Sequence, residues 1–233
     1  MSRYKASLIH LCVSATAVLS FFMLVYYFWY PAPYFLFSDV TDPMIMIAGV
    51  DIVLGPILTL AVFKSGKKGM LFDLCCIGAL QFSALTYGGY AIFQGRPAYI
   101  VYGDGKFNYL TEAQVDRTLL TNTDLQSYSM KPIMAYNPPP KDEITKNILA
   151  FLGPEAAFEY YVPFFPNLKD VLLGSLTVEK LAHIDPRNKI ALDNFVKSHD
   201  KEINDYAYYQ LFKGKKSIVV ALERATGEIV GSI

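Results

Sequence analysis

Residues 49–59 read Gly-Val-Asp-Ile-Val-Leu-Gly-Pro-Ile-Leu-Thr and lie inside an apolar run that extends from Met44 to Phe63. A helix of about 20 apolar residues is long enough to cross the hydrocarbon core of a bilayer. The run carries one charged residue, Asp51, near its middle. A carboxylate at that depth costs roughly 2.5–3.5 kcal/mol on insertion scales. We therefore expect this side chain to face protein rather than lipid.

Small and polar residues recur at helical spacing around Asp51. Intervals of three, four and four residues place Ala48, Asp51, Gly55 and Thr59 on one face of a helix. Pro56 has no N–H, so an α-helix would leave the carbonyl of Ile52 without its hydrogen bond, close to the carboxyl group. We interpret the face as a partner-binding stripe inside the membrane, made of Ala48, Asp51, Gly55, Pro56 and Thr59 together with Gln81 of a later apolar run.

A second interpretation of Asp51 stays open at this point. The carboxyl group pairs within the protein's own helix bundle, against Gln81 or the Thr59 hydroxyl, and has a structural role. Both interpretations satisfy the requirement that polar groups in a bilayer find protein partners.

Charge divides the chain into two halves of different composition. The 233 residues are 53% hydrophobic and 18% charged, and only nine of the 42 charged residues precede residue 94. A soluble domain has about 25% charged residues, and the residues before 94 have far fewer. We therefore predict a membrane half followed by a soluble half. The net charge is zero, so the chain does not have the excess of Lys and Arg that is typical of a nucleic-acid-binding protein. The three cysteines all lie in the membrane half, so the soluble half has no thiol chemistry.

Three apolar runs predict three transmembrane helices, at about residues 6–30, 44–63 and 70–93. The first run is too long for the apolar core of a signal peptide, and Tyr30-Pro31-Ala32-Pro33 is a poor cleavage site, so we expect it to be retained. We predict a three-helix transmembrane domain over residues 1–93 and a soluble domain over residues 94–233.

The basic residues predict the orientation. Arg3 and Lys5 precede the first span, and Lys64, Lys67 and Lys68 lie between the second and third spans. Two spans separate these clusters, so they share one side of the membrane, which the positive-inside rule makes the cytoplasm. We therefore predict a multi-pass protein of the bacterial inner membrane, with its N-terminus in the cytoplasm and its C-terminal domain in the periplasm.

The soluble half predicts a small α+β domain with β-hairpins at its start and end. Two β-prone segments, 97–102 and 106–110, flank Gly103-Asp104-Gly105, and three more lie at 206–212, 217–222 and 228–233. Helices are expected at 112–120, 142–152, 155–161, 178–182 and 187–199, and residues 122–140 are expected to be a loop.

No catalytic constellation is apparent in the soluble half. His183 and His199 are its only histidines, and no serine lies in a Gly-x-Ser-x-Gly context. We expect no catalytic residues, no cofactor, no metal site and no small-molecule substrate, and the pattern favours an interaction protein over an enzyme.

Several segments of the membrane half resemble the type IV pilin accessory protein family, the TfpX/TfpZ group. The resemblance rests on Ser-Arg-Tyr-Lys-Ala at residues 2–6, on Trp-Tyr-Pro at 29–31 and on the stretch from Gly-Val-Asp to Gly-Pro within 49–60. It also rests on residues 67–74 and 87–99. The soluble half matches in outline only, in its first strand and its closing hairpin.

The resemblance implies a function in pilus biogenesis. It implies an inner-membrane accessory factor or chaperone that binds and stabilises a cognate type IV major pilin, through the pilin's transmembrane helix and its globular head. The alternative is a membrane-anchored enzyme that modifies pilin or envelope glycans, and such an enzyme needs clustered carboxylates or histidines.

Overall fold

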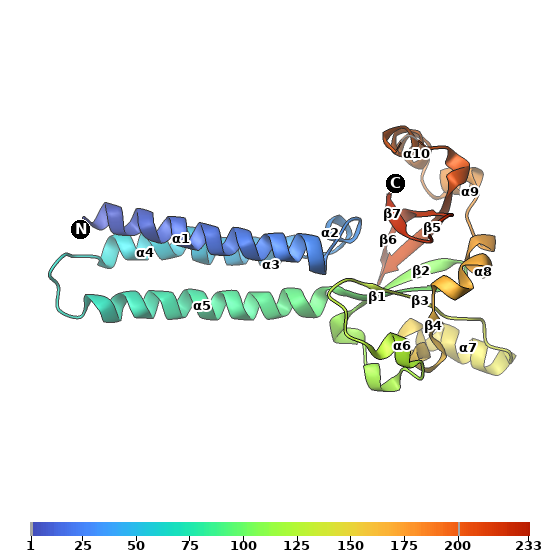
Figure 1. The fold of residues 1–233 in the computed structure, drawn as a ribbon, viewed down its shortest axis with the longest axis horizontal. Helices are drawn as coiled ribbons and strands as arrows, with labels where there is room; N and C mark the ends of the chain where they lie inside the picture. Colours follow the sequence, from blue (N-terminus) through green and yellow to red (C-terminus); the bar gives the residue numbers. More distant parts are fainter. Residues whose placement is uncertain (1, 200) are drawn as a thin grey trace. The chain divides into compact units, whose positions relative to one another are not determined.

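The computed structural model describes residues 2–199 and 201–233, and the chain forms two compact units. The first unit comprises residues 1–31 and 38–96, and the second comprises residues 32–37 and 97–233. Figure 1 shows the first unit as long helices and the second as a sheet with short helices around it. The predicted fold class, three apolar helices followed by a small α+β domain, is confirmed.

Three helices of the first unit are long and apolar enough to cross a membrane, and the chain is a multi-pass membrane protein. The first and second of these are continuous stretches in which π-helical turns interrupt or end the α-helix. Their bounds are α1 (Arg3–Leu24) with η1 (Val25–Trp29), then α3 (Thr41–Ala48), η2 (Gly49–Leu54) and α4 (Gly55–Val62), and finally α5 (Met70–Gly95).

Small residues let these helices approach one another closely. A Cβ on Gly88 of α5 would lie 2.7 Å from the Ile47 side chain of α3, and one on Gly89 would lie 3.3 Å from Phe21 of α1. Near the end of the first span, the Tyr30 hydroxyl donates a 2.7 Å hydrogen bond to the Ile92 carbonyl. The three helices therefore form one packed bundle, as small residues commonly allow in membranes.

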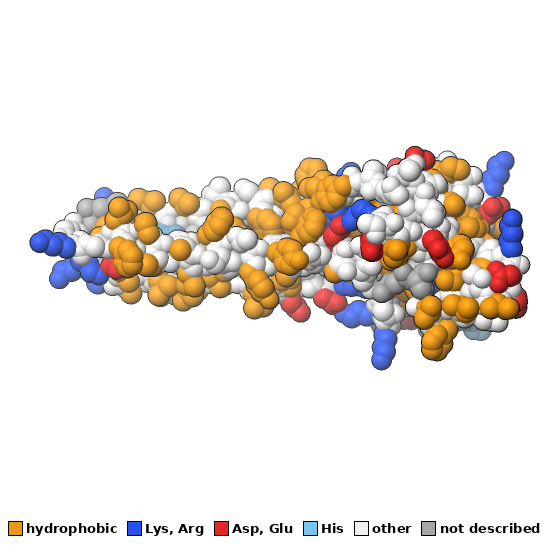
Figure 2. Space-filling model, turned by 90° about the horizontal axis from the view of Figure 1, so that it is seen from below, with side chains coloured by type: hydrophobic (Ala, Val, Ile, Leu, Met, Phe, Trp, Pro, Cys, Tyr) orange, Lys and Arg blue, Asp and Glu red, His pale blue; other side chains and the backbone are white. Residues whose placement is uncertain are grey.

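The outer surface of the bundle is apolar, as lipid requires. Figure 2 shows apolar side chains along the helices, and blue Lys and Arg side chains gathered at the end that carries the N-terminus. That end also carries the loop with Lys64, Lys67 and Lys68, and Lys67 pairs there with Asp73 at 2.5 Å.

A seven-stranded mixed sheet forms the centre of the second unit, in the order β4-β3-β1-β2-β5-β6-β7. Adjacent strands are antiparallel except for the β1–β3 and β2–β5 pairs, which are parallel. The strands are β1 (Pro97–Gly103), β2 (Lys106–Thr111), β3 (Ile133–Tyr136), β4 (Val162–Pro163), β5 (Tyr206–Lys213), β6 (Lys216–Glu223) and β7 (Ile229–Ser232).

The hairpin turns follow from glycine and its neighbours. Asp104 and Gly105 both have positive φ angles, of 51° and 74°. A two-residue turn of this kind matches the twist of the strands that it joins. Gly214 plays the corresponding part between β5 and β6, with a φ of 58°.

Short helices cover the sheet. They are α2 (Tyr34–Phe37), η3 (Glu112–Gln114), η4 (Arg117–Leu119), α6 (Thr123–Gln126), α7 (Glu143–Leu152), η5 (Pro154–Tyr160), η6 (Phe165–Asn167), α8 (Leu168–Leu173), α9 (Val178–Ile184), α10 (Arg187–Ser198) and η7 (Ile203–Asp205).

One face of the sheet carries a single aromatic core and the other face carries two separate clusters. The aromatic core gathers side chains from β1, β2, β5 and β6, with Val171 of α8 packed on them. On the other face, α9 and α10 cover β5 and β6, while η5 and α7 cover β1 and β3. This packing requires glycine at residue 174, because a Cβ there would overlap the Tyr102 hydroxyl.

A segment between the first two spans completes the aromatic core. Tyr34 and Phe37 of α2 are buried, and both rings contact the ring of Tyr109 edge-on at 6.2 Å between centroids. This segment is only six residues long and belongs to the sheet unit rather than to the helical one.

Three local predictions differ from the structure. Residues 112–120 form two separate 3₁₀ turns, η3 and η4, because the side chains of Thr111 and Asp116 cap each turn and the chain extends between them. The predicted loop at 122–140 contains α6 and strand β3, and the predicted helix at 155–161 is the 3₁₀ helix η5. The strand β3 is only four residues long and is held by parallel pairing to β1.

Candidate functional site: a polar cluster in the helical bundle

The second span contains a π-helical turn around Asp51. The N–H of Gly55 bonds to the carbonyl of Val50, five residues earlier. In that register Pro56, which has no N–H, leaves free the carbonyl of Asp51 rather than that of Ile52. Gln81 of α5 donates from Nε2 to the Asp51 carbonyl oxygen at 3.0 Å. The expectation for Ile52 assumed α-helical geometry, and the extra residue in the turn moves the free carbonyl by one position.

Gly55 leaves the space that the Gln81 side chain occupies. A Cβ on Gly55 would overlap Gln81 Nε2 and lie 2.7 Å from its Cδ. Gly55 and Pro56 are both buried, and Gln81 is 8% exposed. The glycine in this span therefore permits a side chain of another helix to reach the backbone.

His10 of the first span joins Gln81 to Thr59. Its Nε2 lies 2.7 Å from Gln81 Oε1, and its Nδ1 lies 2.5 Å from Thr59 Oγ1. Because Gln81 Oε1 is only an acceptor, His10 donates to it from Nε2. All three helices thus contribute to one chain of hydrogen bonds.

Two serines of the first span extend the cluster. Gln81 Nε2 also lies 3.4 Å from Ser14 Oγ, and the Ser7 hydroxyl donates to the Pro56 carbonyl at 2.8 Å. Ser14 is buried and Ser7 is half-buried. The bonds from Ser7 and Gln81 therefore satisfy two carbonyl groups of the second span.

The Asp51 side chain is enclosed in the cluster, with 4% of its surface exposed. Within the described residues, its Oδ1 is buried and has no hydrogen-bond partner. An unsatisfied carboxyl oxygen inside a bilayer is costly, and residues of this kind commonly have a functional role in membrane proteins.

The structure places the six predicted residues around one region of the bundle. Asp51, Gly55, Pro56 and Thr59 are buried together with Gln81, and Ala48 is half-buried one turn before Asp51. The Thr59 hydroxyl bonds to His10 and not to Asp51. Most polar groups of the stripe therefore have partners within the bundle.

The sequence prediction missed the part contributed by the first span. Ser7, His10 and Ser14 follow one another at intervals of three and four residues, which is the spacing of one helix face. This polar stripe in an apolar helix was the available signal. The described residues contain no group of three His, Cys, Asp or Glu side chains that could hold a metal ion.

Known proteins resemble part of this chain. The family model described as fimbrial assembly protein FimB matches residues 1–38. No solved structure matches the chain.

Curated relatives come from Dichelobacter nodosus. The fimbrial assembly protein of serogroups C1 and C2 is 30% identical over 113 residues, which cover 48% of this chain and 86% of the relative. The serogroup E1 and serogroup I fimbrial assembly proteins are also 30% identical over 113 residues, but only 44% of each is covered. The match thus spans less than half the length of these two relatives. Since it takes in most of the C1 and C2 protein, we conclude that this chain belongs to the fimbrial assembly protein family.

Proposed function

We propose that this protein is an inner-membrane accessory factor of the TfpX/TfpZ group that binds and stabilises a cognate type IV major pilin for pilus assembly. It acts by binding, as a chaperone, rather than by catalysis. The bundle of residues 1–93 receives the pilin's transmembrane helix, and the domain of residues 94–233 recognises its globular head in the periplasm. Its relatives are named fimbrial assembly proteins, and this supports the proposal.

The packing of α2 supports the proposed topology. Residues 32–37 pack into the same unit as residues 97–233, so both segments must lie on one side of the membrane. Two spans separate them, which is consistent with that requirement. The basic residues Arg3, Lys5, Lys64, Lys67 and Lys68 lie in segments of the opposite side, and the positive-inside rule makes that side cytoplasmic.

The third span has an outer face suited to another helix. Few residues of α5 are buried in the bundle, and its exposed positions include the small residues Cys75, Ala79, Ser83 and Thr86 at helical spacing. Small residues let helix backbones approach closely in lipid. We place the pilin helix against this face.

Asp51 is 4% exposed and lies on the side of α5 that Gln81 faces, opposite Ala79, so the Asp51 cluster offers a polar contact only when the bundle opens. Oδ1 of Asp51 lacks a partner among the described residues, and a polar group of the inserted pilin helix would supply one. The competing role is structural, with Asp51, Gln81 and their neighbours only holding the bundle together. The bonds of Gln81 to Asp51 and to His10 support the structural role. An experiment must therefore distinguish the structural role from the pilin-binding role.

The main observation in support of pilin recognition is the exposed apolar face of α7. Ile144, Ile148, Phe151 and Leu152 are spaced as one helix face, and 51–90% of the surface of each is exposed. A contiguous apolar face on a domain outside the membrane is typical of a protein-binding surface. The family relationship makes the pilin head the occupant that we propose.

In-cell photo-crosslinking tests the proposal. A photoreactive residue replaces Ile148 on α7 or Ala79 on α5, and the captured protein is identified by mass spectrometry. We expect the major pilin at both positions, and no pilin from the control position Lys189, which lies on α10. Deletion of the protein should lower pilin abundance and piliation; unchanged pilin levels and the absence of pilin crosslinks would rule out the chaperone role.

Asp51→Asn separates the two roles of the cluster. If Asp51 contacts the pilin, the variant remains in the membrane at wild-type abundance and the crosslink from Ala79 weakens. If the residue is structural, the variant protein itself is depleted, and any molecules that remain crosslink as the wild type does.

A further inference from the structure

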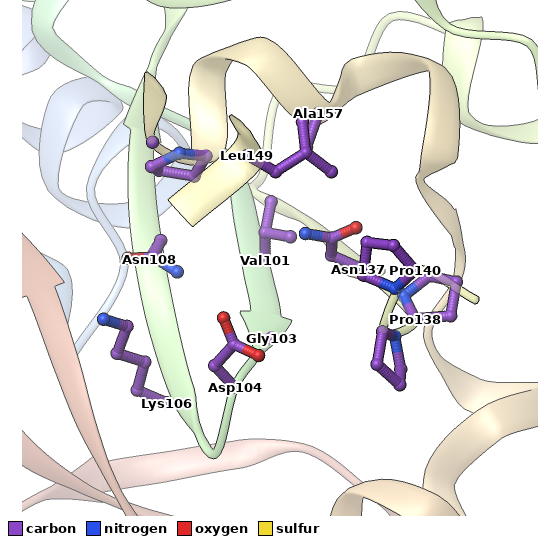
Figure 3. A pocket seen from close by; sticks show the side chains of 13 residues that line it. Val101, Gly103, Asp104, Lys106, Asn108, Asn137, Pro138, Pro140, Leu149 and Ala157 are labelled. Atoms are coloured by element: carbon purple, nitrogen blue, oxygen red, sulfur yellow. The ribbon is translucent and has the colours of Figure 1, made fainter. Parts of the chain in front are cut away.

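A pocket opens at one end of the sheet, beside the turn between β1 and β2. Strands β1 and β2, the segment after β3, and the end of α7 with the chain that follows it line the pocket. Figure 3 shows Val101 at its centre, with Asn108 on one side and Asn137 on the other. The pocket lies within the sheet unit and is separate from the polar cluster of the bundle.

The strand registers explain how the two asparagines reach the same side. Val101 of β1 is opposite Asn108 of β2 and opposite Ala135 of β3. These residues share the face of the sheet that η5 and α7 cover, and Asn137 lies two residues after Ala135 on the same face. Farther along this face, toward Tyr99, the side chains form an apolar core. Carboxamides therefore appear where the covering helices end.

The pocket has an apolar floor and stiff walls. Val101 and Ala157 are each 1% exposed, and Leu149 of α7 packs beside them. Pro138, Pro139, Pro140 and Pro154 form the walls. Proline rings have fixed φ angles, so the walls are ordered before any ligand binds.

Size restricts what can bind. The cavity volume is ≈ 170 Å³, whereas pockets for cofactors and drug-sized ligands are about 300–1,000 Å³. The space accommodates one apolar side chain with its neighbouring peptide groups. Charge gives no preference for an ion, because Asp104 and Lys106 at the mouth have opposite charges and the Lys106 ammonium already lies 5.4 Å from the centre of the Phe212 ring.

One carboxamide oxygen lacks a partner within the described part of the chain. Oδ1 of Asn137 is buried without a hydrogen bond, although the backbone N–H of the same residue donates to the Tyr102 carbonyl at 2.8 Å. In Figure 3 the amide nitrogen of Asn137 points into the pocket. A carboxamide carries one acceptor and two donors, which is the complement of a peptide group.

We infer that this pocket binds an extended, uncharged backbone segment of a partner protein, with an apolar side chain on the Val101 floor and peptide groups bonded to Asn108 and Asn137. Peptide groups that leave water need such partners, and a rigid pocket limits the entropic cost of holding an extended chain. The inference rests on the proposed function in one respect, since the partner that it takes is the major pilin.

Peptide binding to the full-length protein in detergent tests the inference. The probes are overlapping ten-residue peptides that cover the extracytoplasmic part of the cell's major pilin, and binding is followed by fluorescence anisotropy. We expect one region of the pilin to bind. Replacing a single backbone carbonyl oxygen in that region with sulfur should weaken binding, because sulfur is a poorer acceptor for the amide N–H that Asn137 directs into the pocket.

Two variants and a control identify the site. Asn108→Leu and Asn137→Leu should each weaken binding of the peptide about tenfold, the effect of losing one or two buried hydrogen bonds. Asn194→Leu, an exposed position on α10, should bind as the wild type does. The thermal transition of each variant shows whether it is folded, and the half-buried Asn108 remains informative if Asn137→Leu does not fold.

The outcomes separate this inference from the proposed function. If intact pilin binds the protein but no peptide does, and Asn108→Leu binds intact pilin normally, the pocket inference is wrong and the proposed function stands. If neither intact pilin nor any peptide binds, both are wrong. A peptide that binds equally well to the wild type and both asparagine variants places its site elsewhere and also overturns the inference.

Discussion

Gln81 lies where a side chain on residue 55 would lie. A Cβ on Gly55 would overlap the Gln81 amide nitrogen, and that same nitrogen donates to the Asp51 carbonyl. The absent side chain of one helix therefore determines whether the polar side chain of another helix can satisfy its backbone. The relationship links a glycine, a proline and a glutamine that are far apart in the sequence.

Gly55→Ala should expel Gln81 from its position and destabilise the bundle. Overpacking of a filled interior typically costs about 1–3 kcal/mol, and the Asp51 carbonyl also loses its donor. The measurement is the thermal transition of the purified protein in detergent. Gly49→Ala is the matched control, because a Cβ at residue 49 has no atom within 4 Å. Equal transitions for the two variants would contradict this account of Gly55.

Thr59→Val should weaken the bundle by about 0.6–1.7 kcal/mol, the range for hydrogen bonds between helices in membranes. The substitution keeps the shape of the side chain and removes the hydroxyl that His10 contacts at 2.5 Å. Unfolding in detergent with increasing denaturant measures the difference. Thr16→Val is the control, since the hydroxyl of the exposed Thr16 donates to the Cys12 carbonyl of its own helix. A larger effect at residue 16 would refute the importance of the His10 contact.

Phe37→Ala should destabilise the sheet domain, although residue 37 lies between the first two spans. Phe37 is 7% exposed and contacts Tyr109, whereas its neighbour Leu36 is 89% exposed. Truncating a buried phenylalanine costs about 3–5 kcal/mol. Limited proteolysis of residues 97–233 in the full-length protein reports the change. Leu36→Ala should leave the cleavage pattern unchanged, and cleavage rates that are equal in both variants would show that α2 adds nothing to the core.

Acid should weaken the contact between Lys201 and Glu223. The Lys201 ammonium, together with the Thr226 hydroxyl, holds the pKa of Glu223 below its ordinary value of 4.5. A carboxylate with a lowered pKa contributes stability above its ordinary pKa and loses it as the pH falls. Glu223→Gln should therefore reduce the melting temperature at about pH 6 and narrow its difference from the wild type at about pH 3.5.

The control for this pH dependence is Glu179→Gln in the first turn of α9, where the carboxylate is exposed. Its melting curve should follow that of the wild type at each pH. A Glu223→Gln variant whose difference from the wild type stays constant between the two pH values would disprove the effect of the ion pair.

Hydropathy and small-residue spacing predicted the membrane half well. Apolar runs and the 3-4-4 spacing around Asp51 are local properties, and they placed Gly55, Thr59 and Gln81 at the polar cluster. The π-helical turn was not predictable, because it depends on how the three helices pack. His10 was left out of the predicted site, because a lone histidine near the start of a span is more simply explained as interfacial or packed in the bundle.

In the sheet domain, hairpins were predictable and long-range pairings were not. The turn at Asp104 and Gly105 identifies β1 and β2 from neighbouring residues alone. Strand β3 is four residues long and forms only by parallel pairing with β1, some 30 residues away in the chain. The contribution of Tyr34 and Phe37 could not be read from the sequence, since nothing local indicates which core an aromatic residue joins.

The position of α2 also has a consequence for biosynthesis. Tyr34 and Phe37 are made before the second and third spans, yet they complete a core whose other members follow those spans. If only one of the second and third spans inserted, these two rings and the sheet would lie on opposite sides of the membrane. The stability of the sheet domain therefore depends on membrane insertion, because its aromatic core is complete only when both spans have inserted.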